Sequence, residues 1–159
     1  MFTLRRFVSG RLLLAAAFAW WLGGAALLAG ADRVVKVLPH YLDTQGRHAL
    51  SPSLFERDAY QALLRAHPER RGGLRFDVQW KARRAPGQPR RLRLELVSES
   101  HPRGRPLVRE ITLPEKRTRG WAVIKLDAAA ERALGEWRAW RVSLLVGEQV
   151  VSEQHSFLW

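Results

Sequence analysis

The feature that most constrains the fold is an unbroken alternation of apolar and polar side chains over residues 74–83. Leu, Phe, Val, Trp and Ala occupy the even positions, and Arg, Asp, Gln, Lys and Arg occupy the odd ones. Successive side chains point to opposite faces of a β-strand, whereas a helix repeats about every 3.6 residues. The stretch therefore predicts a strand with one face in a core and the other in water.

A second alternating stretch, residues 92–96, follows a break at residues 85–89 that contains two prolines and a glycine. Two such stretches so close in sequence predict neighbouring antiparallel strands. In that pairing, Asp77 and Arg93 would face each other across the wet side of the sheet.

Five further β-prone stretches bring the number of predicted strands to about seven. In one of them Arg109 lies on the apolar face, which indicates a strand at the edge of a sheet. Gly147 and Glu148 interrupt the last stretch, which predicts a closing hairpin. These stretches are residues 34–38, 107–113 and 121–126 and the two halves of 137–159.

Two short helices are predicted between the strands. Ser53, with Glu56 three residues later, forms a reciprocal capping pattern, so a helix is expected over about 53–65. A second helix is expected over 128–134, with Asp127 as its N-cap. On the first helix, Leu54, Phe55, Ala59, Ala62 and Leu63 are expected to face the core, and Glu56, Arg57, Gln61 and Arg65 to face water.

About seven short strands with an inserted helix favour a β-sandwich over a barrel or an α/β sheet. The strand number, the short helix before the penultimate strand and the closing hairpin resemble an immunoglobulin or fibronectin type III module. The Cys and Trp signature of immunoglobulin domains is absent. The expected fold is thus a mainly β, immunoglobulin- or fibronectin III-like sandwich, a likeness of form that carries no function.

The first 31 residues are typical of an export signal. Three arginines and no acidic residue come before an uncharged apolar run at residues 12–31. The run ends in small residues. This order predicts a signal peptide cleaved after Ala31, but about 20 apolar residues are also enough for a transmembrane helix. Signal peptide and signal anchor both place the N-terminus inside and residues 32–159 outside the cytoplasm.

Residues 32–159 are expected to form one domain, in which a strand-plus-helix segment over 32–73 leads into a sandwich core over 74–159. The chain has no cysteine, which excludes disulfides, thiolate metal sites and a cysteine nucleophile. All 15 acidic residues and all but three of the 27 Lys and Arg lie after residue 31. This basic excess attracts nucleic acid, anionic lipid headgroups or acidic polysaccharide, although a GC-rich coding bias also accounts for it.

No pattern of catalytic, cofactor-binding or metal-ligating residues is present. The five histidines show no ligand spacing, no serine stands in a G-x-S-x-G motif, and residues 43–46 fit a β-turn better than a calcium loop. The tryptophans fit a stacking platform or a core, and strand parity favours the core for Trp80 and Trp140. Leu158 and Trp159 are the apolar residues most open to a partner.

One group of basic residues is predicted to gather at one end of the domain. If the strands from residue 74 onward alternate up and down, the loops 84–91 and 114–120 emerge at the same end of the domain. The alternative is a solvated, arginine-rich loop end that only keeps the domain soluble. The residues predicted to contact an anionic partner are Arg83, Arg84, Arg90, Arg91, Lys116, Arg117 and Arg119.

These observations predict a non-catalytic module of the periplasm or cell envelope that binds a protein or an anionic polymer without a cofactor or metal. Two alternatives stay open. One is a membrane-anchored subunit of a larger envelope complex, held in the membrane by residues 12–31, and the other is a small extracytoplasmic hydrolase. Nucleic acid is not an expected partner, and the oligomeric state is left open.

Overall fold

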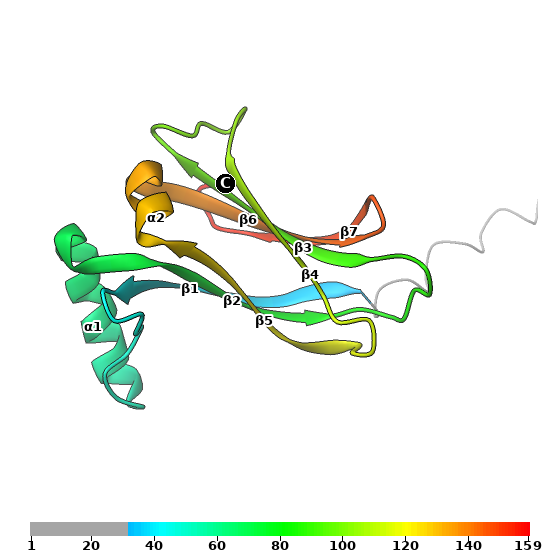
Figure 1. Ribbon diagram of the computed structural model, residues 1–159, viewed down its shortest axis with the longest axis horizontal. Helices are drawn as coiled ribbons and strands as arrows, with labels where there is room; N and C mark the ends of the chain where they lie inside the picture. Colours follow the sequence, from blue (N-terminus) through cyan, green and yellow to red (C-terminus); the bar gives the residue numbers. More distant parts are fainter. Residues whose placement is uncertain (1–31) are drawn as a thin grey trace, which may run out of the picture.

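The computed structural model describes residues 32–159, so the predicted signal peptide or anchor lies outside the described residues. Seven strands form two antiparallel sheets that stack face to face (Figure 1). The prediction of a mainly β fold with two packed sheets is confirmed. The strands are β1 (Arg33–Asp43), β2 (Arg71–Lys81), β3 (Arg90–Ser98), β4 (Leu107–Thr112), β5 (Arg119–Asp127), β6 (Trp137–Val146) and β7 (Gln149–His155).

The strand order is β1-β2-β5 in the three-stranded sheet and β4-β3-β6-β7 in the four-stranded sheet. The edge position predicted for the strand that contains Arg109 is confirmed, because β4 ends its sheet. β1 runs past the predicted end at residue 38 and includes Pro39. A proline is tolerated there because β1 is also an edge strand.

The predicted pairing of the strands at 74–83 and 92–96 is wrong. β2 pairs with β1 and β5, whereas β3 pairs with β4 and β6. The connection between β2 and β3 is too long for a tight turn, and it crosses from one sheet to the other. The two apolar faces therefore meet through the core, and Asp77 does not face Arg93 but accepts hydrogen bonds from Arg75.

The core lies between the sheets, where the even-numbered residues over 74–80 of β2 and 92–96 of β3 are almost completely buried. Trp80 is part of this core, as strand parity predicts. Trp137 and Trp140 pack against Phe76 with ring centroids 6.0 and 6.4 Å away. The apolar alternation in the sequence thus translates directly into the packed interior of the sandwich.

Helix α1 (Leu54–Ala66) begins where the sequence predicts, because the Ser53 side chain accepts a hydrogen bond from the Glu56 N–H at 3.5 Å. The reciprocal half of the capping pattern is absent. The Ser53 N–H donates to the Ser51 hydroxyl instead of to Glu56. Helix α1 lies at one end of the sandwich, beside the C-terminal end of β1 (Figure 1).

The predicted faces of α1 are only partly right, since Leu63 packs against the core as predicted. Leu64 and Gln61 are buried, whereas Leu54 and Phe55 are exposed, Phe55 to 83%. The helix turns the Gln61 side, and not the Leu54 side, toward the sheet because the Gln61 amide forms hydrogen bonds with the backbone of β1. It accepts from the Tyr41 N–H at 2.8 Å and donates to the Tyr41 carbonyl at 3.0 Å.

Helix α2 (Ala128–Leu134) matches its prediction, since Asp127 caps it by accepting from the Ala130 N–H. The hairpin at Gly147 and the turn at residues 43–46 are also observed. A 3-10 helix, η1 (Pro68–Arg70), links α1 to β2. Among residues 32–159, no helix has the length and apolarity needed to cross a membrane.

Candidate functional site

The loops that carry the predicted contact residues meet at one end of the sandwich. Arg33 at the start of β1 pairs in register with Lys81 at the end of β2, and Lys81 pairs with Arg119 at the start of β5. The end of β6 lies beside the start of β3 in the other sheet. We call this end, with residue 32, loops 82–89 and 113–118 and the turn 147–148, the basic end.

Arg90 is a structural residue of the basic end. Its side chain is buried, with only 3% of the residue exposed. The guanidinium donates to the carbonyl oxygens of Arg83, Pro114 and Glu115 at 3.1, 2.8 and 2.8 Å. Arg90 therefore holds the two loops together, and its donors are not available to a partner.

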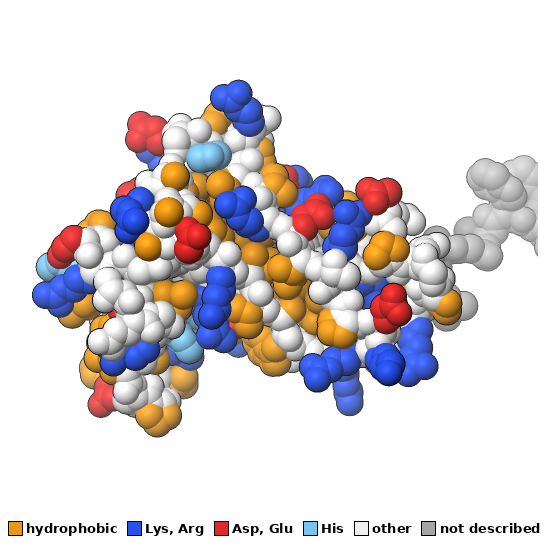
Figure 2. All heavy atoms as spheres, viewed as in Figure 1, with side chains coloured by type: hydrophobic (Ala, Val, Ile, Leu, Met, Phe, Trp, Pro, Cys, Tyr) orange, Lys and Arg blue, Asp and Glu red, His pale blue; other side chains and the backbone are white. Residues whose placement is uncertain are grey.

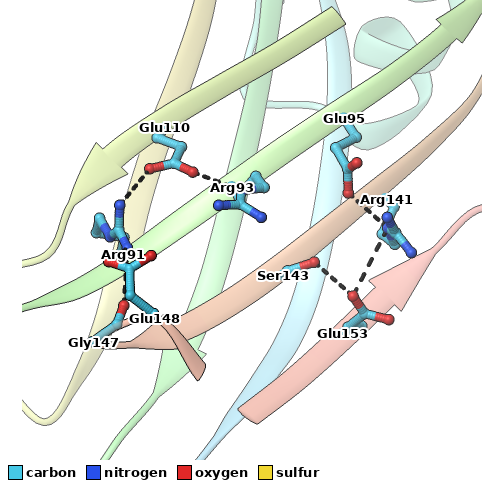
Figure 3. A network of polar contacts seen from close by, with 9 residues as sticks. All are labelled: Arg91, Arg93, Glu95, Glu110, Arg141, Ser143, Gly147, Glu148 and Glu153. Atoms are coloured by element: carbon cyan, nitrogen blue, oxygen red, sulfur yellow. Dashed lines mark hydrogen bonds and ion pairs between the residues drawn. The ribbon is translucent and has the colours of Figure 1, made fainter. Parts of the chain in front are cut away.

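Arg91 lies on the outer face of the four-stranded sheet, where Figure 3 shows it between two carboxylates. Its guanidinium donates to Glu110 at 3.0 Å, to Glu148 at 2.7 Å and to the carbonyl of Gly147 at 2.9 Å. Its charge is already neutralised, so a partner would have to displace two carboxylates to reach it. Arg91 thus belongs to a surface network and not to an open anion site.

The same network continues along β3, β4, β6 and β7 (Figure 3). Arg93 donates to Glu110 at 2.6 Å, and Arg141 donates to Glu95 at 2.7 Å. The hydrogen bond from Arg93, with the nearby charge of Arg91, holds the pKa of Glu110 below its ordinary value. The outer face of this sheet therefore presents paired charges.

The other five predicted contact residues are exposed, and they are Arg83, Arg84, Lys116, Arg117 and Arg119. Only Arg83 has a carboxylate nearby, because its Nε lies 4.0 Å from Asp32 Oδ2. Across residues 32–159, no carboxylate lies within 4.0 Å of the other four. The preceding 31 residues contain no acidic side chain that could pair with them.

Sequence reasoning missed Arg33 and Lys81, which the strands themselves bring to this end beside the predicted contact residue Arg119. Arg33, Lys81 and Arg119 form a row across the outer face of the three-stranded sheet. Like charges placed directly opposite each other destabilise a sheet. The outward parity of Lys81 was visible in the alternation of residues 74–83, but its two neighbours depend on pairings between distant strands.

An exposed aromatic residue lies next to this row. Trp121 is 50% exposed, unlike Trp80, which belongs to the core. It shares the outer face of β5 with Arg119, two residues earlier, and lies opposite Gln79. Figure 2 shows Lys and Arg side chains gathered at the lower right, around the basic end.

Loops 82–89 and 113–118 enclose a shallow pocket of about 220 Å³. Arg84 and Lys116 contribute exposed charge to its lining. The lining contains one carboxylate, that of Glu115, and no hydroxyl, thiol or imidazole side chain. It consists of Arg84, Ala85, Pro86, Gly87, Gln88, Arg90, Glu115 and Lys116.

The other residues considered from sequence are dispersed. The rings of His40 and His48 lie 5.0 Å apart, and burial, with the charge of His48, lowers the pKa of His40. Within residues 32–159, no group of three or more His, Cys, Asp or Glu residues is placed to hold a metal ion. Trp159 stacks on the Arg141 guanidinium at 4.7 Å, whereas Leu158 is exposed.

Comparison of the chain with protein-family models, with curated proteins and with solved structures returned no match. Its function is therefore inferred from the residues and their arrangement.

Proposed function

We propose that this chain is a non-catalytic binding module of the cell envelope, located outside the cytoplasm, whose contact surface is the basic end. One observation carries the proposal. Exposed Lys and Arg without carboxylate partners gather at this end, whereas the outer face of the four-stranded sheet pairs its arginines with glutamates. Unpaired charges gathered on one surface give the long-range attraction that draws an anionic partner.

The sandwich itself is proposed to be of the immunoglobulin or fibronectin type III kind. In immunoglobulin domains the first, second and fifth strands share one sheet and the third, sixth and seventh share the other. The strand order found here agrees with that arrangement, and the fourth strand joins the third. An experimental structure that places the fourth strand beside the fifth would instead indicate the arrangement of a constant-type immunoglobulin domain.

The binding proposal is tested by retention of the full chain on a sulfonated matrix at low salt. The triple variant Arg84→Glu, Lys116→Glu, Arg117→Glu should elute at clearly lower salt than the wild type. A matched triple variant at the opposite end, Arg70→Glu, Arg105→Glu, Arg132→Glu, has the same net charge and should elute later than the first. Equal elution of the two variants would mean that only net charge matters and that the basic end is not a site.

The absence of catalysis is a separate part of the proposal. The lining of the pocket at the basic end has no hydroxyl, thiol or imidazole side chain, which supports a binding role. Assay of the purified chain on a panel of esters, glycosides and peptides is expected to give no turnover. Turnover that the Lys116→Glu variant loses would favour the alternative of a small hydrolase.

A membrane-anchored subunit of a larger envelope complex is a second candidate. An exposed apolar cluster of Leu50, Leu54 and Phe55 around the start of α1 favours it, because such clusters mark protein contacts. This cluster lies at the end of the sandwich opposite residue 32, where an anchored domain would present it to a partner (Figure 1). The intact mass of the protein from its native membrane separates the forms: a start at Met1 supports the anchor, and a start at Asp32 rejects it.

A further inference from the structure

We propose that the partner of the basic end is the anionic headgroup surface of a phospholipid membrane, with the outer face of β5 turned toward it. This inference rests on the proposed function, because it names the anionic partner of the same surface. It follows from where the apolar run at residues 12–31 ends, from which charges are unpaired and from where Trp121 lies.

The first step is the position of residue 32. The apolar run at residues 12–31 ends directly before Asp32, and Arg33 already belongs to β1. An extended chain covers about 3.3 Å per residue, so Arg33 lies within about one Debye length, roughly 8 Å at physiological salt, of the end of that run. Whenever the run is held in a bilayer, the basic end is therefore at the bilayer surface.

The second step is the charge of this surface. The row of Arg33, Lys81 and Arg119 across β1, β2 and β5 places like charges opposite each other. Such a row is unfavourable in water alone, and an anionic surface would relieve it. Each Lys or Arg near an anionic leaflet strengthens attraction on the order of fivefold.

The third step is Trp121, which distinguishes a membrane from a soluble acidic polymer. Its half-exposed side chain lies on the same outer face as Arg119, two residues further along β5. Tryptophan is enriched at the level of lipid headgroups, where its apolar ring and its N–H both find suitable surroundings. Basic residues beside an outward tryptophan at the point where the chain emerges from its apolar run match a lipid surface.

The test uses the full chain with one introduced cysteine, since the natural sequence has none. A fluorophore on Thr118→Cys reports on the basic end, and one on Gly104→Cys reports on the opposite end, where an added side chain meets no neighbouring atom. The protein is incorporated into vesicles of phosphatidylcholine, with or without one third phosphatidylglycerol, that carry a headgroup-linked quencher.

We expect clearly stronger quenching at position 118 with phosphatidylglycerol than without it, and none at position 104. Raising the salt from about 50 to about 500 mM should reduce the quenching at position 118 to the level seen without phosphatidylglycerol, because screening shortens the range of attraction. The Arg84→Glu, Lys116→Glu, Arg117→Glu variant should weaken the attraction of the basic end to the anionic vesicle surface by about 100-fold or more. The matched variant at Arg70, Arg105 and Arg132 should keep the quenching, and Trp121→Ser should weaken it.

Quenching at position 118 that is the same with and without phosphatidylglycerol would overturn the inference. The outcome of the matrix experiment then separates the two proposals. If the sulfonated matrix still retains the wild type to clearly higher salt than the basic-end variant, the proposed function stands with an anionic polymer as its partner. If neither the vesicles nor the sulfonated matrix distinguish the two triple variants, both proposals fail.

Discussion

At the scale of single residues, one buried polar side chain connects the N-terminal segment to the sandwich. Arg71, at the start of β2, donates to the carbonyls of Leu64 and Arg65 at 2.7 and 2.6 Å. These carbonyls end helix α1 and have no partner within the helix. The same guanidinium lies 3.4 Å from Glu131 of α2 and 2.7 Å from Glu136. One side chain thus fixes both helices to the three-stranded sheet.

Replacing Arg71 with Met should destabilise the protein by about 3 to 5 kcal/mol, because it leaves Glu131 buried without its partner. The control is Arg75→Met, which removes a partly exposed pair with Asp77 and should cost less than about 1 kcal/mol. Urea unfolding followed by tryptophan fluorescence measures both. Equal costs for the two variants would show that Arg71 does not fix the helices.

Asp43 makes the stability of the folded protein depend on pH in the acidic range. Burial alone would raise the pKa of its carboxyl group, but hydrogen bonds from the Arg47 N–H, the Tyr60 hydroxyl and the Arg47 guanidinium outweigh burial. They lower the pKa from 3.8 to about 2. Since the folded state holds the lower pKa, the ionised carboxylate stabilises the fold above about pH 4, and this contribution is lost as the pH falls toward 2.

Asp43→Asn should therefore cost about 2 kcal/mol at neutral pH and should flatten the stability profile between pH 4 and pH 2. Urea unfolding of wild type and variant across that range measures the effect. The two curves are expected to converge near pH 2, where the wild-type carboxyl is itself becoming protonated. A constant difference at every pH would assign the loss to packing and not to ionisation.

At the scale of elements, helix α1 shows why an amphipathic pattern can misplace a helix face. The apolar pattern favoured Leu54 and Phe55 as buried, but the start of the helix extends beyond the sheets and leaves them exposed. Gln61 is buried because its amide satisfies the backbone of β1, which is an edge strand without a neighbour on that side. A buried polar group with its hydrogen bonds complete costs little, and periodicity does not reveal such pairing.

A pair of substitutions in α1 tests this orientation. Leu64→Ala should destabilise the protein by about 2 to 5 kcal/mol, because Leu64 is fully buried and its loss leaves a cavity. Phe55→Ser should change stability by no more than about 0.5 kcal/mol, as for exposed positions in general. Thermal and urea unfolding measure both. A large loss with Phe55→Ser would mean that the helix packs through the face first predicted from sequence.

At the scale of the whole molecule, local rules predicted the elements but not their partners. The strand at 74–83, the cap at Asp127 and the turn at Gly147 depend on neighbouring residues, and each was found. The pairing of β2 with β5 joins residues far apart in sequence, so nothing in the alternation could reveal it. The common end of the two basic loops was found nevertheless, because successive strands alternate in direction whichever sheet they join.

The candidate site was predictable only in part for the same reason. Arg83–Arg84 and Arg90–Arg91 are similar pairs in the sequence. Arg90 is nevertheless buried, because carbonyl oxygens of the loop between β4 and β5 accept its hydrogen bonds. Arg91 is neutralised by carboxylates of β4 and of the turn before β7. Whether an arginine is open to a partner or part of the structure depends on such tertiary contacts, which sequence spacing does not contain.

The last prediction concerns the unity of the domain, since the sequence suggested a leading segment at 32–73 and a sandwich core at 74–159. The buried cluster includes Val34, Val37, Tyr41 and Leu64 from the leading segment. Burying four apolar side chains contributes about 6 to 12 kcal/mol, comparable to the roughly 5 to 15 kcal/mol stability of a whole domain.

A chain of residues 74–159 would also lack β1 and would expose the edge of β2. It should give no near-ultraviolet circular dichroism and no cooperative unfolding, whereas residues 32–159 should show both. Cooperative unfolding of the shorter chain would mean that residues 74–159 fold independently and that the leading segment only packs against them.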